Sequence, residues 1–188
     1  ARFTPWSDGM QIRSFQNLKV TGHFDADRQV LLENIIINSR LGYYVLSPLR
    51  VDDNTPLLLV NRGWFERNSA EPDTDRLALH SNRVTVRGRA GSLPRAGYRM
   101  GESIPAAPGW PKLAVYPTLD EIAAVLGEPV QPFVLLMDPD DELGFFRHWV
   151  PEEMGPGRHY AYALQWFAMG LVLAVLLIWN YRKRGLES

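Results

Sequence analysis

The chain has 188 residues, 46% of them hydrophobic, and a formal net charge of -1. Positive and negative side chains are mixed along it, so the sequence lacks the basic surface that nucleic acid requires, and nucleic acid is excluded as a partner. The sequence contains no cysteine, which excludes disulfides, zinc-thiolate sites and thiol nucleophiles.

The first third of the chain predicts four β-strands, the last two paired in a hairpin. The runs rich in β-branched and aromatic residues cover residues 15–24, 29–38, 42–51 and 57–65. An Asp-Asp-Asn sequence between the last two runs supplies the hairpin turn. The fourth run opens with Leu-Leu-Leu-Val, which does not alternate with polar residues. It therefore predicts a strand covered on both faces, in a sandwich or closed barrel.

The middle of the chain predicts two irregular segments on either side of one strand. Residues 66–82 are polar and predict a loop or a short amphipathic helix. Residues 83–91 alternate polar and apolar side chains, as a half-buried strand does. Frequent proline and glycine between residues 92 and 110 forbid regular structure, so we expect a long external loop there.

One helix is predicted before the C-terminal segment, at residues 118–127. Thr118 caps its start, Glu121 completes a capping box, and Gly127 ends it. Three short strands are also predicted in this part of the chain, at residues 112–117, 132–138 and 145–150. Seven or eight strands with one helix predict a β-dominated α+β fold, a small β-barrel-like extramembrane domain.

The C-terminal segment predicts a transmembrane helix. Between Tyr160 and Tyr181 no side chain is charged, and the run from Leu171 to Ile178 is apolar on every face. At a rise of about 1.5 Å per residue, this segment is about 33 Å long, which matches a hydrocarbon core of about 30 Å. The predicted domains are a β-rich extramembrane domain, a transmembrane helix and a basic tail, at residues 1–157, 158–181 and 182–188.

The charges after this helix predict its direction. Arg182, Lys183 and Arg184 follow it directly, and an excess of Lys and Arg marks the cytoplasmic side of a membrane. We therefore expect the domain in the periplasm, at the bacterial inner (plasma) membrane; the compact length favours this over the mitochondrial inner membrane. The sequence begins without an apolar run, so we expect that an upstream first transmembrane helix is missing from it.

The sequence contains no P-loop, dinucleotide fingerprint, nucleophile elbow or HExxH zinc motif, so no enzyme activity is predicted. His23, His80 and His148 are scattered and are expected to be structural or exposed. His159 differs, because it lies where the chain enters the bilayer, next to Arg158. A neutral imidazole there can bind haem iron, and a guanidinium can pair with haem propionates. The alternative is that both residues only anchor the helix among lipid headgroups.

Three segments, taken together, carry a family resemblance. They read Gly-Tyr-Tyr-Val-Leu-Ser-Pro-Leu, Leu-Val-Asn-Arg-Gly-Trp and His-Tyr-Ala-Tyr-Ala-Leu-Gln-Trp-Phe, at residues 42–49, 59–64 and 159–167. In this order they resemble the surfeit locus protein 1 family, the assembly factors of cytochrome c oxidase. The resemblance implies two membrane spans with an external domain, and it places the proposed haem-binding histidine at His159. It implies no cofactor role for residues 61–64, where we expect Gly63 to permit a bulge or close approach beside Trp64, and Arg62 to be a surface or partner contact.

The resemblance implies a non-enzymatic chaperone of the respiratory chain. Such a protein receives haem a as a transient cofactor and helps it into subunit I, the large catalytic subunit of cytochrome c oxidase. The implied partners are subunit I, haem a synthase and membrane lipid, with His159 as the metal ligand and Arg158 beside it. The alternative is a scaffold or accessory subunit that stabilises an oxidase assembly intermediate without haem, using the domain surface and the small residues Ala168 and Gly170. A third hypothesis is that the protein is an external hydrolase. The sequence supplies neither a catalytic triad nor a set of metal ligands for such an enzyme.

Overall fold

A computed structural model describes residues 2–69, 72–79, 83–94, 103–147, 149 and 156–185. In the C-terminal helix, it describes the side chains of residues 160 and 162–182. The chain divides into two units, Ala1–Trp149 and Val150–Ser188, and each is described by itself.

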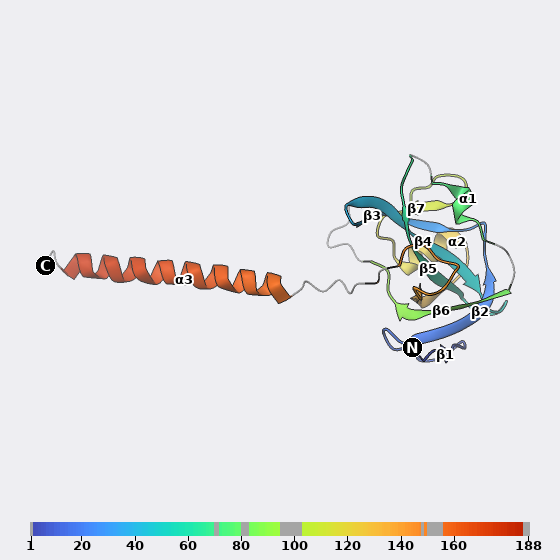
Figure 1. Ribbon diagram of the computed structural model, residues 1–188, viewed down its shortest axis with the longest axis horizontal. Helices are drawn as coiled ribbons and strands as arrows, with labels where there is room; N and C mark the ends of the chain where they lie inside the picture. The colour runs from blue at the N-terminus through green and yellow to red at the C-terminus, as the bar shows by residue number, and fades with distance from the viewer. Residues whose placement is uncertain are drawn as a thin grey trace. The chain divides into compact units, whose positions relative to one another are not determined.

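Eight strands make up the sheet of the first unit (Figure 1). They are β1 (Thr4–Pro5), β2 (Asn17–Phe24), β3 (Val30–Ile37), β4 (Arg40–Arg50), β5 (Leu57–Glu66), β6 (Arg83–Gly91), β7 (Lys112–Ala114) and β8 (Val130–Met137). Their order in the sheet is β1-β2-β6-β8-β5-β4-β3-β7. The pairs β1/β2, β3/β7 and β5/β8 are parallel, and the other pairs are antiparallel. The predicted β-rich domain is therefore confirmed, while the two-residue strand β1 was not foreseen.

Strand β2 also pairs with β4, so the pairings run from β2 through β6, β8, β5 and β4 and return to β2. This returning contact is short, because it joins His23 to Arg50 and Phe24 to Leu49 and extends no further in the described register. Gly22 permits it, since a Cβ there would collide with the carbonyl oxygen of Arg50. The barrel-like closure of the sheet stays a prediction.

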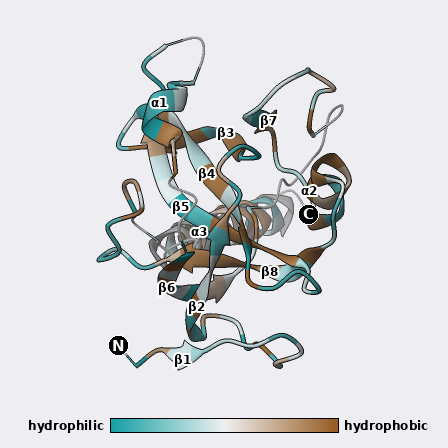
Figure 2. Ribbon diagram, turned by 90° about the vertical axis from the view of Figure 1, so that its right-hand side faces the viewer, coloured by the Kyte–Doolittle hydropathy of each residue, from teal (hydrophilic) through white to brown (hydrophobic). Residues whose placement is uncertain are grey.

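Strand β5 lies at the centre of the sheet and is buried along nearly its whole length. Leu58 and Val60 belong to a core cluster shared with β2, β6 and β8. Leu57 and Leu59 belong to a second cluster that includes side chains of a helix. Hydrophobic residues gather along β3 and on the same helix, α2 (Figure 2). The prediction that the Leu-Leu-Leu-Val run is a strand covered on both faces is confirmed.

Helix α2 (Leu119–Leu126) packs against β8 and begins where the sequence predicts. The Thr118 side chain accepts a hydrogen bond from the Glu121 backbone N–H, and the Glu121 carboxylate accepts one from the Thr118 N–H, so the capping box is present. Gly127 ends the helix in a left-handed conformation with a φ of 72°. This local prediction is confirmed in every part.

The two irregular segments agree with the sequence prediction where the structure describes them. Between β5 and β6, the described residues contain one short helix, α1 (Thr74–Leu77), capped by Asp73. After β6, residues 92–94 and 103–110 contain no strand or helix. Residues 95–102, the centre of the predicted external loop, lie outside the described part of the chain.

The predicted strand at residues 145–150 is wrong for the residues that are described. Phe146 forms one isolated bridge with Trp64 of β5, and no ladder continues from it through residue 147. Instead of a continuing ladder, the Arg147 side chain ties this segment to the preceding turn: its guanidinium donates to the carbonyl oxygens of Asp141 at 2.5 Å and Pro139 at 2.9 Å. Residues 148 and 150 lie outside the described part.

The second unit contains one long helix, α3 (Pro156–Gly185). Its stretch Tyr162–Arg182, 21 residues, is long and apolar enough to cross a membrane. The large apolar side chains from Leu164 to Ile178 are 45–79% exposed, so the protein itself does not cover them. The helix begins before residue 158 and continues past residue 181, the predicted ends of the span.

Candidate functional sites

The structure places His159 and Arg158 in the first turns of α3, and their side chains lie outside the described ones. Their predicted roles in haem binding therefore stay predictions. Because the backbone is helical here, Tyr162 and Ala163 follow His159 at the spacing that brings residues onto one helix face. A haem can be bound by the groups that these residues supply, which are an imidazole, a guanidinium, an aromatic ring and a small side chain. These residue types therefore fit haem a, the cofactor that the family resemblance implies.

Arg62, in β5, is a cation inside the domain and is only 5% exposed. Its guanidinium donates to the carbonyl oxygens of Leu143 at 2.9 Å and Leu77 at 3.0 Å, and more weakly to Gln29 Oε1 at 3.4 Å. It also lies over the Phe145 ring, 4.8 Å from the centroid. No ion pair joins it to a carboxylate within the described residues. The expectation of a surface or partner contact is wrong, because the central strand and the 143–147 segment bury this side chain.

Burial weakens the proton affinity of this guanidinium. Desolvation, and to a smaller extent the positive charge of Arg147, lower the pKa of Arg62 to about 10. The group stays charged at neutral pH, so carbonyl oxygens and an aromatic ring must compensate its charge. Arg62 thereby ties three separate segments to the central strand: the 143–147 segment, helix α1 and the start of β3.

Asn61 and Gly63 shape the backbone on either side of Arg62. The Asn61 side chain, 3% exposed, accepts a hydrogen bond from the Gly63 N–H at 3.0 Å. Gly63 has a φ of 112°, and a Cβ there would lie 2.6 Å from Arg147 Cγ and 2.7 Å from the Phe146 carbonyl oxygen. Only glycine can adopt this positive φ and also leave room for the close approach of residues 146 and 147. The predicted close approach at Gly63 is confirmed.

Trp64 packs beside this glycine, as expected. It is 9% exposed, and its indole N–H donates to the Ile35 carbonyl oxygen at 3.0 Å. Its backbone N–H donates to the Phe146 carbonyl oxygen at 2.7 Å and its own carbonyl accepts from the Phe146 N–H at 3.1 Å. The two rings meet edge to face with centroids 6.3 Å apart. The Asn-Arg-Gly-Trp sequence is therefore a structural junction between β5 and the segment that precedes the linker to α3.

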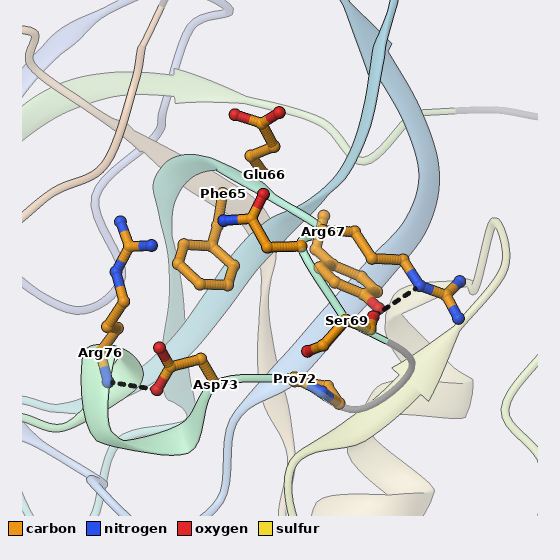
Figure 3. A pocket seen from close by; sticks show the side chains of 9 residues that line it. Phe65, Glu66, Arg67, Ser69, Pro72, Asp73 and Arg76 are labelled. Atoms are coloured by element: carbon orange, nitrogen blue, oxygen red, sulfur yellow. Dashed lines mark hydrogen bonds between the residues drawn. The ribbon is translucent and has the colours of Figure 1, made fainter.

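A line of contacts through two adjacent aromatic rings leads from Arg62 to a second guanidinium. Phe145 meets Phe65 edge to face, with centroids 5.3 Å apart, and the guanidinium of Arg76 lies 4.7 Å from the Phe65 centroid. The line ends at a pocket on the domain surface, which Phe65 and Arg76 help to line (Figure 3). Tyr43 also lines this pocket. Sequence reasoning missed this arrangement. The available signal was a charged residue within an apolar strand, which requires an internal partner.

The remaining histidines form no metal site in the described part of the chain. There, no group of three or more His, Asp or Glu side chains is arranged to hold a metal ion. His23 is exposed near the end of β2 and has its own interactions. His80 and His148 lie outside the described residues.

Comparison with known proteins gives three similarities. A model of the SURF1 family matches residues 3–171. A SURF1-like protein of Rickettsia bellii (strain RML369-C) is 26% identical over 182 residues, which cover 93% of this chain and 71% of that protein. A SURF1-like protein of Dictyostelium discoideum is 44% identical over 50 residues, or 27% of this chain and 18% of that protein. No solved structure matches.

Proposed function

This chain belongs to the SURF1 family, the oxidase assembly factors, and from that membership we propose that it helps to deliver haem a to cytochrome c oxidase. One observation carries the proposal. The His-Tyr-Ala-Tyr-Ala-Leu-Gln-Trp-Phe segment opens the one described helix that is long and apolar enough to cross a membrane. A histidine at that place offers an iron ligand beside lipid, where an apolar macrocycle can be held.

In this proposal the chain binds and orients haem a, and carries out no reaction on it. The His159 imidazole would hold the haem iron, and the Arg158 guanidinium would pair with the haem propionates. Haem a supplies the redox-active iron that the oxidase needs once the haem has been transferred.

The proposed partners are subunit I of the oxidase, which receives the haem, and haem a synthase, which supplies it, with membrane lipid around α3. The proposed location is the bacterial inner membrane, with the β-rich domain in the periplasm. The basic residues Arg182, Lys183 and Arg184 support that direction, because such residues mark the cytoplasmic flank of a span.

The test is an optical spectrum of the intact protein purified in detergent from cells that also make haem a. We expect a Soret band in the unchanged protein and its loss in His159→Ala. His23→Ala is the matched control, because His23 is an exposed histidine in β2, and it should keep the band. A band that survives His159→Ala would move the iron ligand elsewhere.

The scaffold function remains the second candidate, and one observation favours it. A Cβ at Gly170 would have no atom within 4 Å, so this place on α3 is open to the close approach of another helix. In that case oxidase subunits would co-purify with an unpigmented protein, and Gly170→Leu would remove them. Under haem delivery, Gly170→Leu would instead leave the Soret band of the purified protein unchanged.

A further inference from the structure

A small pocket on the β-rich domain has no role in haem delivery as proposed above. Its volume is about 70 Å³, and it lies between the end of β5, the loop that follows, and helix α1. Figure 3 shows Arg76 and Asp73 of the α1 region on one side of it and Arg67 and Ser69 of the loop on the other. Side chains from separate segments thus converge on one space.

Tyr43 of β4 gives this pocket an unusual feature. The residue is 1% exposed, yet its hydroxyl has no hydrogen-bond partner among the described residues. A buried hydroxyl without a partner is unfavourable, because folding removes its water and gives nothing in return. Burial also raises the pKa of Tyr43, so the hydroxyl keeps its proton and can donate it in a hydrogen bond.

Two guanidinium groups add positive charge at the same pocket. Arg76 is exposed and lies over the Phe65 ring, and within the described residues its guanidinium has neither an ion pair nor a hydrogen bond. Arg67 already has partners within the protein. Its Nε donates to the Ser69 carbonyl oxygen at 3.2 Å, and its guanidinium lies 3.9 Å from Glu33. Arg76 is therefore the cation that is available to a ligand.

The pocket's own acidic side chains limit the charge of that ligand. Glu66 pairs with Arg40 at 3.1 Å, and Asp73 accepts a hydrogen bond from the Arg76 backbone N–H at 3.3 Å. Both carboxylates line the pocket together with the two arginines, so its formal charges balance. The two carboxylates repel a dianion such as phosphate more strongly than a singly charged group. A volume of about 70 Å³ corresponds to about two waters at roughly 30 Å³ each, which is room for a carboxylate group.

We propose that the pocket between β5 and α1 binds a carboxylate group, with the Tyr43 hydroxyl and the Arg76 guanidinium as its hydrogen-bond donors. A guanidinium presents two parallel N–H groups that match the two oxygens of a carboxylate. The hydroxyl supplies a third donor from inside the pocket and in turn gains the partner that it lacks among the described residues. The carboxylate belongs either to a free small acid or to the end of a peptide chain.

The proposal is tested by titrating the full chain in detergent with acetate and following the backbone amide signals of Phe65 and Asp73 by NMR. Acetamide is the matched ligand control, because it has the same shape without the charge. We expect saturable shifts with acetate, smaller ones with acetamide, and weaker binding of inorganic phosphate. A short peptide with a free C-terminal carboxylate, compared with its amide, identifies the source: tighter binding than acetate indicates a chain end.

Two variants locate the contacts. Tyr43→Phe removes only the hydroxyl, so the domain should keep or raise its unfolding midpoint, while acetate affinity falls about tenfold, the loss expected for one charge-assisted hydrogen bond. Arg76→Gln should weaken acetate at least as much. The controls Tyr44→Phe and Arg13→Gln should leave the affinity unchanged. Equal shifts with acetamide, tighter binding of phosphate, or full affinity in both variants would overturn the proposal.

Discussion

Two apolar stretches of this chain have nearly the same composition and opposite surroundings. Residues 57–60 of β5, Leu-Leu-Leu-Val, are 0–1% exposed, whereas the large apolar side chains of residues 171–178 in α3 are 52–68% exposed. Neighbouring strands and α2 cover the first stretch. No described part of the protein covers the second, which is long and apolar enough to cross a membrane. Hydropathy alone does not distinguish a core strand from a span; length and the neighbouring elements do.

The two stretches also treat polar groups differently. Strand β5 carries Asn61 and Arg62, and the folded domain supplies partners for both. Helix α3 does not need such partners from other elements. It has no charged side chain between Tyr160 and Tyr181, and its backbone groups form hydrogen bonds within the helix. The β-rich domain is therefore sensitive to the loss of a polar contact, and the helix to the gain of a polar group.

The largest expected effect is the loss of Arg62. Arg62→Ala leaves the carbonyl oxygens of Leu77 and Leu143 buried without their donor, and we expect it to lower the free energy of unfolding by about 3–5 kcal/mol. Urea unfolding of the full chain in detergent, followed by near-UV circular dichroism, measures the change. The exposed Arg13→Ala is the control. A cost as small as that of the control would mean that Arg62 is not held as described.

A matched pair of leucines sharpens the comparison. Leu59→Ala in β5 creates a cavity in a packed core and should lower the free energy of unfolding by about 2–5 kcal/mol. Leu173→Ala in α3 removes the same atoms from a side chain that is 59% exposed, so it should leave the domain's stability unchanged. The same urea unfolding experiment compares them. Equal losses in both variants would contradict the division into a self-covered sheet and a lipid-covered helix.

The reverse test places a charge in the helix. Val172→Asp puts a carboxylate near the middle of Tyr162–Arg182, where it should oppose membrane insertion by about 2.5–3.5 kcal/mol. The share of protein that resists alkaline extraction from membranes measures this. The domain should keep its urea midpoint, because α3 is not part of its core. Full insertion of the variant would argue that this segment does not lie within lipid.

The smallest expected effect concerns pH and belongs to the domain surface. Hydrogen bonds from Arg28 and then Arg50 lower the pKa of Glu128, whose side chain is 32% exposed. The folded pKa is below the ordinary value, so this stabilisation is complete above that value and disappears as the pH falls through the folded pKa. Glu128→Gln should therefore cost less than about 1 kcal/mol at neutral pH and nothing in acid.

A pH series of urea midpoints tests this prediction, with the exposed Glu142→Gln as the control. A cost for Glu128→Gln that persists unchanged at low pH would show that the carboxylate's charge is not what stabilises the domain there.

The sequence predicts those parts of the fold whose causes are local. The capping box of Thr118 and Glu121 and the unalternating run in β5 depend on residues close in sequence, and both predictions are confirmed. Arg62 was misjudged because its surroundings come from residues far along the chain, including Leu143. The strand expected at 145–150 is wrong in its described residues, because only Phe146 pairs with β5, through one isolated bridge to Trp64. The haem ligands His159 and Arg158 stay predictions.

The central claim, that α3 lies in lipid while the β-rich domain lies in water, can be measured by single-cysteine labelling, because the natural sequence has no cysteine. Asp53→Cys, at an exposed turn between β4 and β5, and Val172→Cys, within α3, are treated with a membrane-impermeant maleimide in native membranes. We predict rapid labelling at position 53 and none at position 172 until detergent and denaturant are added. Equal labelling of both positions in intact membranes would contradict the account.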